Sequence, residues 1–226
     1  MAANAIHMTA QTLTPFAYHS LMVQSGTATL PELIGDRAAA FGLAAALGMT
    51  AARVALPPKD YRGHLAAMPW RTSVFMTDDP KLLPPVTRRL NLDAEAGIQA
   101  KVASVAKRGN LKDFFHTQEI PPGQTFAGAI FGMDGFDPFE ETGEEELVIR
   151  IGLHRNGMVR LKRSEDQAGP VRLNASTAAL FGRELPVDRY CLHSLQLPPW
   201  MALEAAAAEV SEWVADVDSG GKRRKA

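Results

Sequence analysis

Apolar and polar residues alternate along residues 147–155, LVIRIGLHR. This period of two predicts a β-strand with one buried face and one exposed face. The side chains expected to face the core are those of Leu147, Ile149, Ile151 and Leu153, and those expected to face outward belong to Arg150, Gly152 and His154.

The residues after this strand are mostly basic, so their register in a sheet matters. A two-residue turn at 156–157 would place Arg160 opposite Leu153, on the apolar side of the sheet. Because a buried cation is costly, we expect either a β-bulge that shifts the register or a chain that leaves the sheet at Asn156. The acidic residues 144–146 offer an alternative, since they could neutralise the cations across the sheet. In each case the same basic residues share one small surface: Arg150, His154, Arg155, Arg160, Lys162 and Arg163.

Three other segments have the composition of strands. Aromatic and β-branched residues predict strands over 13–23 and 71–77. Residues 114–133 predict a strand, a tight turn at 121–123 (Pro-Pro-Gly) and a second strand over TFAGAIFG. The turn is expected because proline presets φ and glycine accepts a positive φ.

Two segments have helical periodicity. The first runs from about Thr29 to a stop at Gly48, a length of about four turns, and the second lies near the C-terminal end of the sequence. Strands followed by a helix, twice over, predict an α+β fold with an antiparallel sheet. The apolar positions of the second helix are Trp200, Leu203, Ala207, Val210, Val214 and Val217.

Residues 92–112 follow neither period. Their helical propensity is interrupted by Gly97 and by alternation around VASVA. We interpret them as an extended hairpin or a mobile arm, inserted at about 84–113.

Length and composition predict one large domain. The chain has 226 residues and is 46% hydrophobic and 22% charged, as in ordinary globular proteins. The single cysteine excludes an internal disulfide, and no apolar run approaches the roughly 20 residues of a membrane span. We therefore expect a cytoplasmic protein.

The two ends of the sequence are expected to lie outside the domain. His7-Met8 is the dipeptide that a common cloning junction encodes, which predicts a native start at Met8 and added residues at 1–7. The domain is then expected over 8–218, followed by a basic, disordered tail at 219–226.

Charge is unevenly distributed along a chain whose net charge is −1. Local basic faces on a neutral chain favour a nucleic-acid footprint, although a solvated surface is the alternative. The acidic run is 140–146, and the basic segments are 87–91, 101–112, 150–163 and 221–226.

Familiar catalytic motifs are missing from the sequence. It contains no GxxxxGK[ST], no HExxH and no GxSxG, and its six histidines lack ligand spacing. Cys191 lies in the apolar context YCLHSL, where a buried hydrophobe is favoured over a Cys-His pair with His193. We therefore predict no catalytic residue, no metal and no cofactor.

The order of these segments resembles a known family. The order of five segments is similar to that in the RAMP superfamily of CRISPR-associated proteins. These segments are a first strand, the helix LIGDRAAAFGLAAALG, the strand pair around PPGQTFAGAIFG, the strand IRIGLHRNG and finally YCLHSLQLPPW. Within it, the chain most resembles the subunit that caps the crRNA 5′ handle in class 1 effector complexes, in its subtype I-D form. The matching segments are Ile34–Gly48, Ile149–Arg155 and Leu195–Pro199. His154-Arg155 departs from the basic-then-aromatic pair expected there.

This resemblance implies a ferredoxin-like (RRM-like) antiparallel sheet with helices on one face and an inserted thumb. It implies a non-catalytic subunit that binds crRNA, contacts the backbone-forming and large subunits, and meets target DNA or RNA indirectly. The insertion at 84–113 would be the thumb, and Trp70-Arg71 and Phe114-Phe115-His116 could stack on bases. The further candidate RNA contacts are Arg88, Arg89, Lys101, Lys107, Arg108, Lys112 and Arg71.

Two other functions remain open from the sequence. One is a metal-independent, crRNA-processing endoribonuclease on the same fold, with His19, His116 or His154 as the base. The other is a protein-interaction module whose basic patches meet acidic partners.

Overall fold

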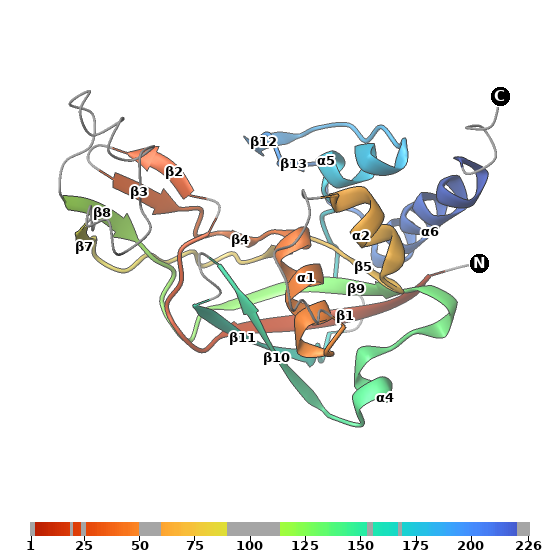
Figure 1. The fold of residues 1–226 in the computed structure, drawn as a ribbon, viewed down its shortest axis with the longest axis horizontal. Helices are drawn as coiled ribbons and strands as arrows, with labels where there is room; N and C mark the ends of the chain where they lie inside the picture. Colours follow the sequence, from red (N-terminus) through yellow and green to blue (C-terminus); the bar gives the residue numbers. More distant parts are fainter. Residues whose placement is uncertain are drawn as a thin grey trace.

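The computed structural model describes residues 3–18, 20–23, 26–49, 60–89, 114–152, 156–166 and 169–220 (Figure 1). They form a mixed α+β fold around a curled, seven-stranded antiparallel sheet. The strand order is β10-β11-β1-β9-β6-β4, with β5 also paired to β9. The bounds are β1 (Asn4–Thr12), β4 (Leu33–Ile34), β5 (Trp70–Thr72), β6 (Phe75–Met76), β9 (Thr125–Gly132), β10 (Glu146–Ile151) and β11 (Gly157–Arg163).

Strand β1 is a central strand of this sheet. It pairs along its length with β9 and along its second half with β11. Every second side chain from Ile6 onward, namely Ile6, Met8 and Ala10, is buried in the core. The strand begins at Asn4, so residues 4–7, which are expected to lie outside the domain, form the first half of β1. The predicted strand over 13–23 is likewise displaced, because β1 ends at Thr12 and only 20–23 are extended again.

A second, four-stranded sheet projects from the first, at the left of Figure 1, and we call it the arm sheet. Its order is β2-β3-β8-β7, with β3 and β8 parallel and β7 and β8 antiparallel. The base of the predicted arm is therefore a hairpin of β7 and β8, while residues 90–113 lie outside the described residues. The bounds are β2 (Ser20–Val23), β3 (Gly26–Thr29), β7 (Val86–Arg89) and β8 (Phe114–Gln118).

The helices pack mainly at the side of the molecule opposite the arm sheet (Figure 1). Helix α1 begins at Asp36 instead of near Thr29, because residues 26–29 and 33–34 are used in strands. Its end agrees with the sequence, since Gly48 has φ 71°. The helices are α1 (Asp36–Ala46), α2 (Tyr61–Ala67), α4 (Pro138–Thr142), α5 (Ala175–Ala178) and α6 (Leu203–Gly220), with 3-10 turns η2 (Met133–Gly135) and η4 (Ala179–Phe181).

Close approach of α1 and α6 to the sheet builds the core. At Gly42 of α1, a Cβ would lie 3.2 Å from Ile151 and 3.3 Å from Ile149, so the helix packs directly on β10. Helix α6 buries Leu203, Ala206, Ala207, Val210 and Trp213. Trp200 precedes this helix and is 49% exposed, so its predicted place on the apolar face is wrong.

A two-stranded sheet of β12 (Arg189–Leu192) and β13 (Leu195–Leu197) covers a smaller cluster around Leu30, Leu33 and Val74. Among the helices that the structure describes, none has the length and apolarity needed to cross a membrane.

Candidate nucleic-acid interface

The hairpin of β10 and β11 sets the direction of the basic side chains. Ile149 pairs with Val159, and Ile151 pairs with Gly157, so residues 152–156 connect the strands. The two-residue turn at 156–157 is therefore absent, and the basic residues after it stay in the sheet. The longer connection shifts the register, so that Arg160 lies opposite Val148 and Lys162 lies opposite Glu146.

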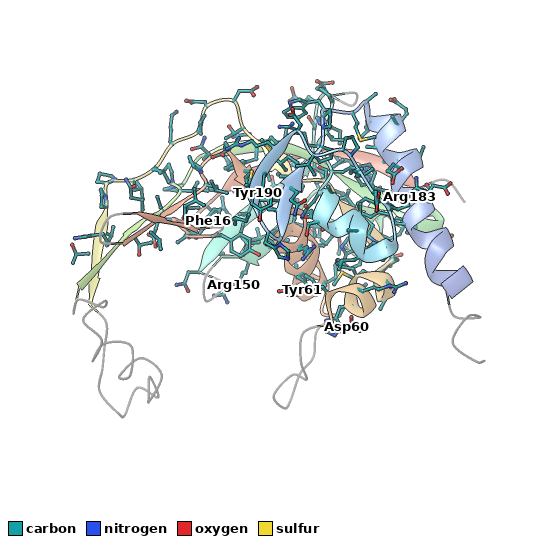
Figure 2. All side chains as sticks on the ribbon, turned by 90° about the horizontal axis from the view of Figure 1, so that it is seen from above. Phe16, Asp60, Tyr61, Arg150, Arg183 and Tyr190 are labelled. Atoms are coloured by element: carbon teal, nitrogen blue, oxygen red, sulfur yellow. The ribbon has the colours of Figure 1, made fainter. Side chains whose placement is uncertain are left out.

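Phe16 fixes the end of this hairpin. Its buried ring fills the space beside Gly157, where a Cβ would lie 2.6 Å from the Phe16 Cβ. Backbone hydrogen bonds in both directions join Phe16 to Ile120, just before the Pro-Pro-Gly turn. Figure 2 shows Phe16 where the arm sheet meets the main sheet, and Arg150 near the border of the molecule.

One side of the main sheet is open to solvent over β10, β11, β1 and β9. Val148 and Met158 on this side are 42% and 38% exposed. The register places side chains in cross-strand rows, because directly paired residues share a face. We call this surface the outer face; its residues are Thr9, Gln11, Thr125, Ala127, Glu146, Val148, Arg150, Met158, Arg160 and Lys162.

Glu146 partly neutralises the outer face. Arg160 Nε lies 3.0 Å from one of its carboxylate oxygens, and Lys162 pairs with the other. The hydrogen bond from Lys162, followed by the charges of both cations, holds the pKa of Glu146 below its usual value. The expected alternative of neutralisation across the sheet is thus realised by one carboxylate, which pairs with both Arg160 and Lys162.

Arg163 belongs to a different contact. Its guanidinium bonds the buried Asp137 at 2.6 Å and lies 5.0 Å from the centre of the Phe139 ring. Asp137 also caps α4 by accepting a hydrogen bond from the Phe139 backbone. Arg163 therefore links α4 to the end of β11 and is not part of the outer face.

Arg71 is buried, at 2% exposure, which corrects its place among the candidate RNA contacts. It donates hydrogen bonds to the carbonyls of Met68 and Trp70, and it lies 5.0 Å from the centre of the Phe181 ring. Burial lowers the pKa of Arg71 to about 10. Trp70 is also fully buried, so it is not available to stack on a base.

The remaining basic candidates belong to the arm and to the 152–156 connection. Arg88 and Arg89 lie on β7, opposite Phe115 and Phe114 of β8. The predictions for Lys101, Lys107, Arg108, Lys112, His154 and Arg155 fall outside the described residues.

The structure does not assemble the predicted nuclease histidines within its described part. His116 Nδ1 lies 3.1 Å from Thr87 Oγ1 in the arm sheet, while His19 and His154 are outside the described residues. Cys191 packs against the Leu195–Leu197 cluster, and burial raises the pKa of its thiol. A thiol that stays protonated is a poor nucleophile.

Sequence reasoning missed the contribution of β1 to the outer face. Thr9 and Gln11 of β1 pair with Lys162 and Arg160 of β11. The alternation of apolar and polar residues in Met8-Thr9-Ala10-Gln11 is the sequence signal for this strand. The interpretation of residues 1–7 as added sequence removes the first half of this strand from the pattern.

Comparison with known proteins adds no assignment: no family model matches the chain, and no curated protein matches it significantly. The outer face is the feature of the described residues that bears on function.

Replacing Glu146 with glutamine is expected to tighten the binding of a polyanion to the outer face about threefold at low salt, because it releases two cations. The measurement is fluorescence anisotropy with a labelled single-stranded RNA. Glu144→Gln, in the same acidic run but outside the outer face, is the matched control. Equal tightening in both variants would mean that only net charge matters.

Proposed function

We propose that this chain is a non-catalytic RNA-binding subunit of a class 1 CRISPR ribonucleoprotein, which holds the 5′ handle of the crRNA. It acts in the cytoplasm, beside the backbone-forming and large subunits. Its closest functional counterpart is the subtype I-D form of the handle-capping subunit, and its contact with target DNA or RNA is indirect.

The observation that carries this proposal is the outer face. Arg160 and Lys162 share one carboxylate there, and the exposed apolar groups of Val148 and Met158 lie on the same face. Arg150 lies on this face as well. Cations contact phosphates, and apolar surface next to them can receive splayed bases. A solvent-exposed sheet face with both features suits a single strand of RNA.

The topology supports a ferredoxin-like core in this proposal. Strand β1, helix α1, strands β5 and β6, and strand β9 occur in a β-α-β-β order along the chain, with the arm sheet, β4 and α2 inserted between them. Strands β1 and β9 are neighbours at the centre, and β6 and β11 flank them. This arrangement supports the proposal of a ferredoxin-like core, a class whose open sheet face binds RNA in RRM domains.

The arm sheet supports the thumb of the proposed subunit. It carries Arg88 and Arg89 on β7 at the start of the segment 90–113, in which Lys101, Lys107, Arg108 and Lys112 occur. A basic projection beside a basic sheet face extends the path that a polyanion can follow.

The test is a salt titration of binding to a labelled CRISPR repeat RNA, with a scrambled RNA alongside. The wild-type chain is compared with a triple variant, Arg150→Ala, Arg160→Ala and Lys162→Ala. We expect preference for the repeat, and a log–log salt slope that falls by about 2 in the triple variant, at about 0.7 per lost phosphate contact on a single strand.

Arg62→Ala provides the control, because it removes an exposed cation on α2, outside the outer face. Its salt slope should equal that of the wild type. The proposal is overturned if neither the isolated chain nor the chain co-expressed with its neighbouring subunits prefers the repeat, or if the triple variant keeps the wild-type slope.

A further inference from the structure

A small pocket lies at one end of the outer face. Its volume is about 270 Å³, and it opens between the segment after β6 and the Pro-Pro-Gly turn before β9. The pocket lining includes Thr77, Asp79, Lys81, Pro122, Gln124 and Thr125.

Buried hydrogen bonds hold the pocket walls in place. The Gln124 side-chain amide donates to the Asp79 carbonyl, and its oxygen accepts from the Lys81 backbone at 3.1 Å. Thr12, at the end of β1, donates through its hydroxyl to the Pro121 carbonyl at 2.7 Å and accepts from the Gln124 backbone at 2.8 Å. Gln124 and Thr12 are both buried, so the two walls form one preorganised unit.

The chemistry of the lining favours a neutral, flat, polar group. Lys81 Nζ lies 2.5 Å from Asp79 Oδ2, so the one cation is neutralised and a phosphate gains little. Hydroxyls of Thr77 and Thr125 supply donors and acceptors, and the proline rings supply apolar surface. A nucleobase combines a hydrogen-bonding edge with an apolar face and matches this lining.

The pocket is continuous with the outer face through Thr125. Thr125 lies opposite Gln11, which lies opposite Arg160. Two strand spacings, about 10 Å, separate Thr125 from Arg160 along this row. A base in the pocket therefore leaves its sugar-phosphate chain directed along the row toward the Arg160 guanidinium.

We infer that this pocket holds one unpaired base of the RNA that lies on the outer face. The inference rests on the proposed function. In this arrangement the pocket fixes the register of the RNA on the outer face. A base held in the pocket sets the position of the strand, whereas phosphate contacts alone allow the strand to bind in several registers.

The experiment combines a filled pocket with removal of single bases from the RNA. Thr125→Phe occupies the pocket mouth, and Val187→Phe adds a comparable ring at an exposed position that belongs neither to the pocket nor to the outer face. Both positions are exposed, and equal melting temperatures will verify the fold. Affinity is measured by anisotropy for intact repeat RNA and for RNAs that are abasic at one position each.

For the wild type and Val187→Phe, one abasic position should weaken binding about tenfold, the range expected for a single held base. Thr125→Phe should bind intact RNA about tenfold more weakly and lose this dependence on the base. A 4-thiouridine at the sensitive position should crosslink to residues 121–125 of the wild-type chain.

The results separate the pocket from the function on which it rests. If the wild type binds RNA, but Thr125→Phe has the same affinity and the same abasic profile as Val187→Phe, the pocket inference is overturned and the outer face stands. A crosslink confined to another segment also overturns it. If the wild type binds no RNA in any state, the proposed function itself has failed.

Discussion

Replacing Gly132 with alanine is expected to lower the free energy of unfolding by about 3 kcal/mol, the upper part of the range for overpacking. Gly132 is on the central strand β9, between Asn4 of β1 and Trp70 of β5. A Cβ there would lie 1.8 Å from the Phe136 carbonyl oxygen and 2.8 Å from its carbon. The Phe136 ring stacks on Trp70, with ring centres 5.1 Å apart, so the backbone cannot move away without breaking that contact.

Urea unfolding followed by circular dichroism measures this effect, with Gly143→Ala as the matched control. Gly143 ends α4 with φ 68°, and nothing lies within 4 Å of its added Cβ. That variant should therefore lose only about 1 kcal/mol, from the left-handed backbone. Equal losses in the two variants would contradict the packing of residues 133–137 against β9.

Segments with a strong local pattern were predicted well from the sequence. TFAGAIFG forms β9 with the expected bounds, and residues 146–151 form β10 with the expected alternation. The turn at 121–123 has its glycine at φ 80°. In each case the period of the side chains, or the backbone demand of proline and glycine, is local and acts without distant partners.

Prediction failed where a distant contact decides the structure. Residues 29–34 are expected to begin a helix, but β3, which ends at Thr29, pairs with β8, and β4 pairs with β6, so tertiary pairing decides their structure. The register of the β10–β11 hairpin depends on Phe16 beside Gly157, a contact between segments far apart in the sequence. No pattern within residues 147–163 contains that information.

The candidate site divides in the same way. Alternation gives the outward direction of Arg150, and the hairpin places Arg160 and Lys162 beside it. The burial of Arg71 and the bond from Arg163 to Asp137 depend on elements brought in from elsewhere in the chain. A basic residue in a sequence is therefore a candidate for polyanion contact only until its partners are known.

Replacing Asp36 with alanine is expected to destabilise the fold by about 3 kcal/mol, the cost of leaving buried polar groups without partners. Asp36 opens α1 at 4% exposure. Its carboxylate accepts from Asn174 Nδ2 at 2.7 Å and from Thr177 Oγ1 at 2.5 Å. These bonds tie α1 to α5, and alanine would leave the Asn174 amide and the Thr177 hydroxyl without this acceptor.

The same carboxylate should make stability depend on pH. Burial raises the pKa of Asp36, against the opposing hydrogen bonds from Thr177 and Asn174. A raised folded-state pKa means that the native state binds the extra proton. The stabilisation is therefore complete below the unfolded pKa of about 4 and is lost as pH rises through the folded-state pKa.

Asp36→Asn isolates this effect, because the amide is nearly isosteric and does not titrate. Urea unfolding of both proteins at a series of pH values should show the stability of the wild type, relative to Asp36→Asn, decreasing as pH rises. The hydrogen bond from Arg183 lowers the pKa of Glu209, and Lys162 lowers that of Glu146, which gives both the opposite pH dependence. Those contributions are common to the two proteins and cancel in the difference. A difference that stays constant or increases with pH would mean that Asp36 is ionised at no cost, and that its bonds to Asn174 and Thr177 outweigh its burial.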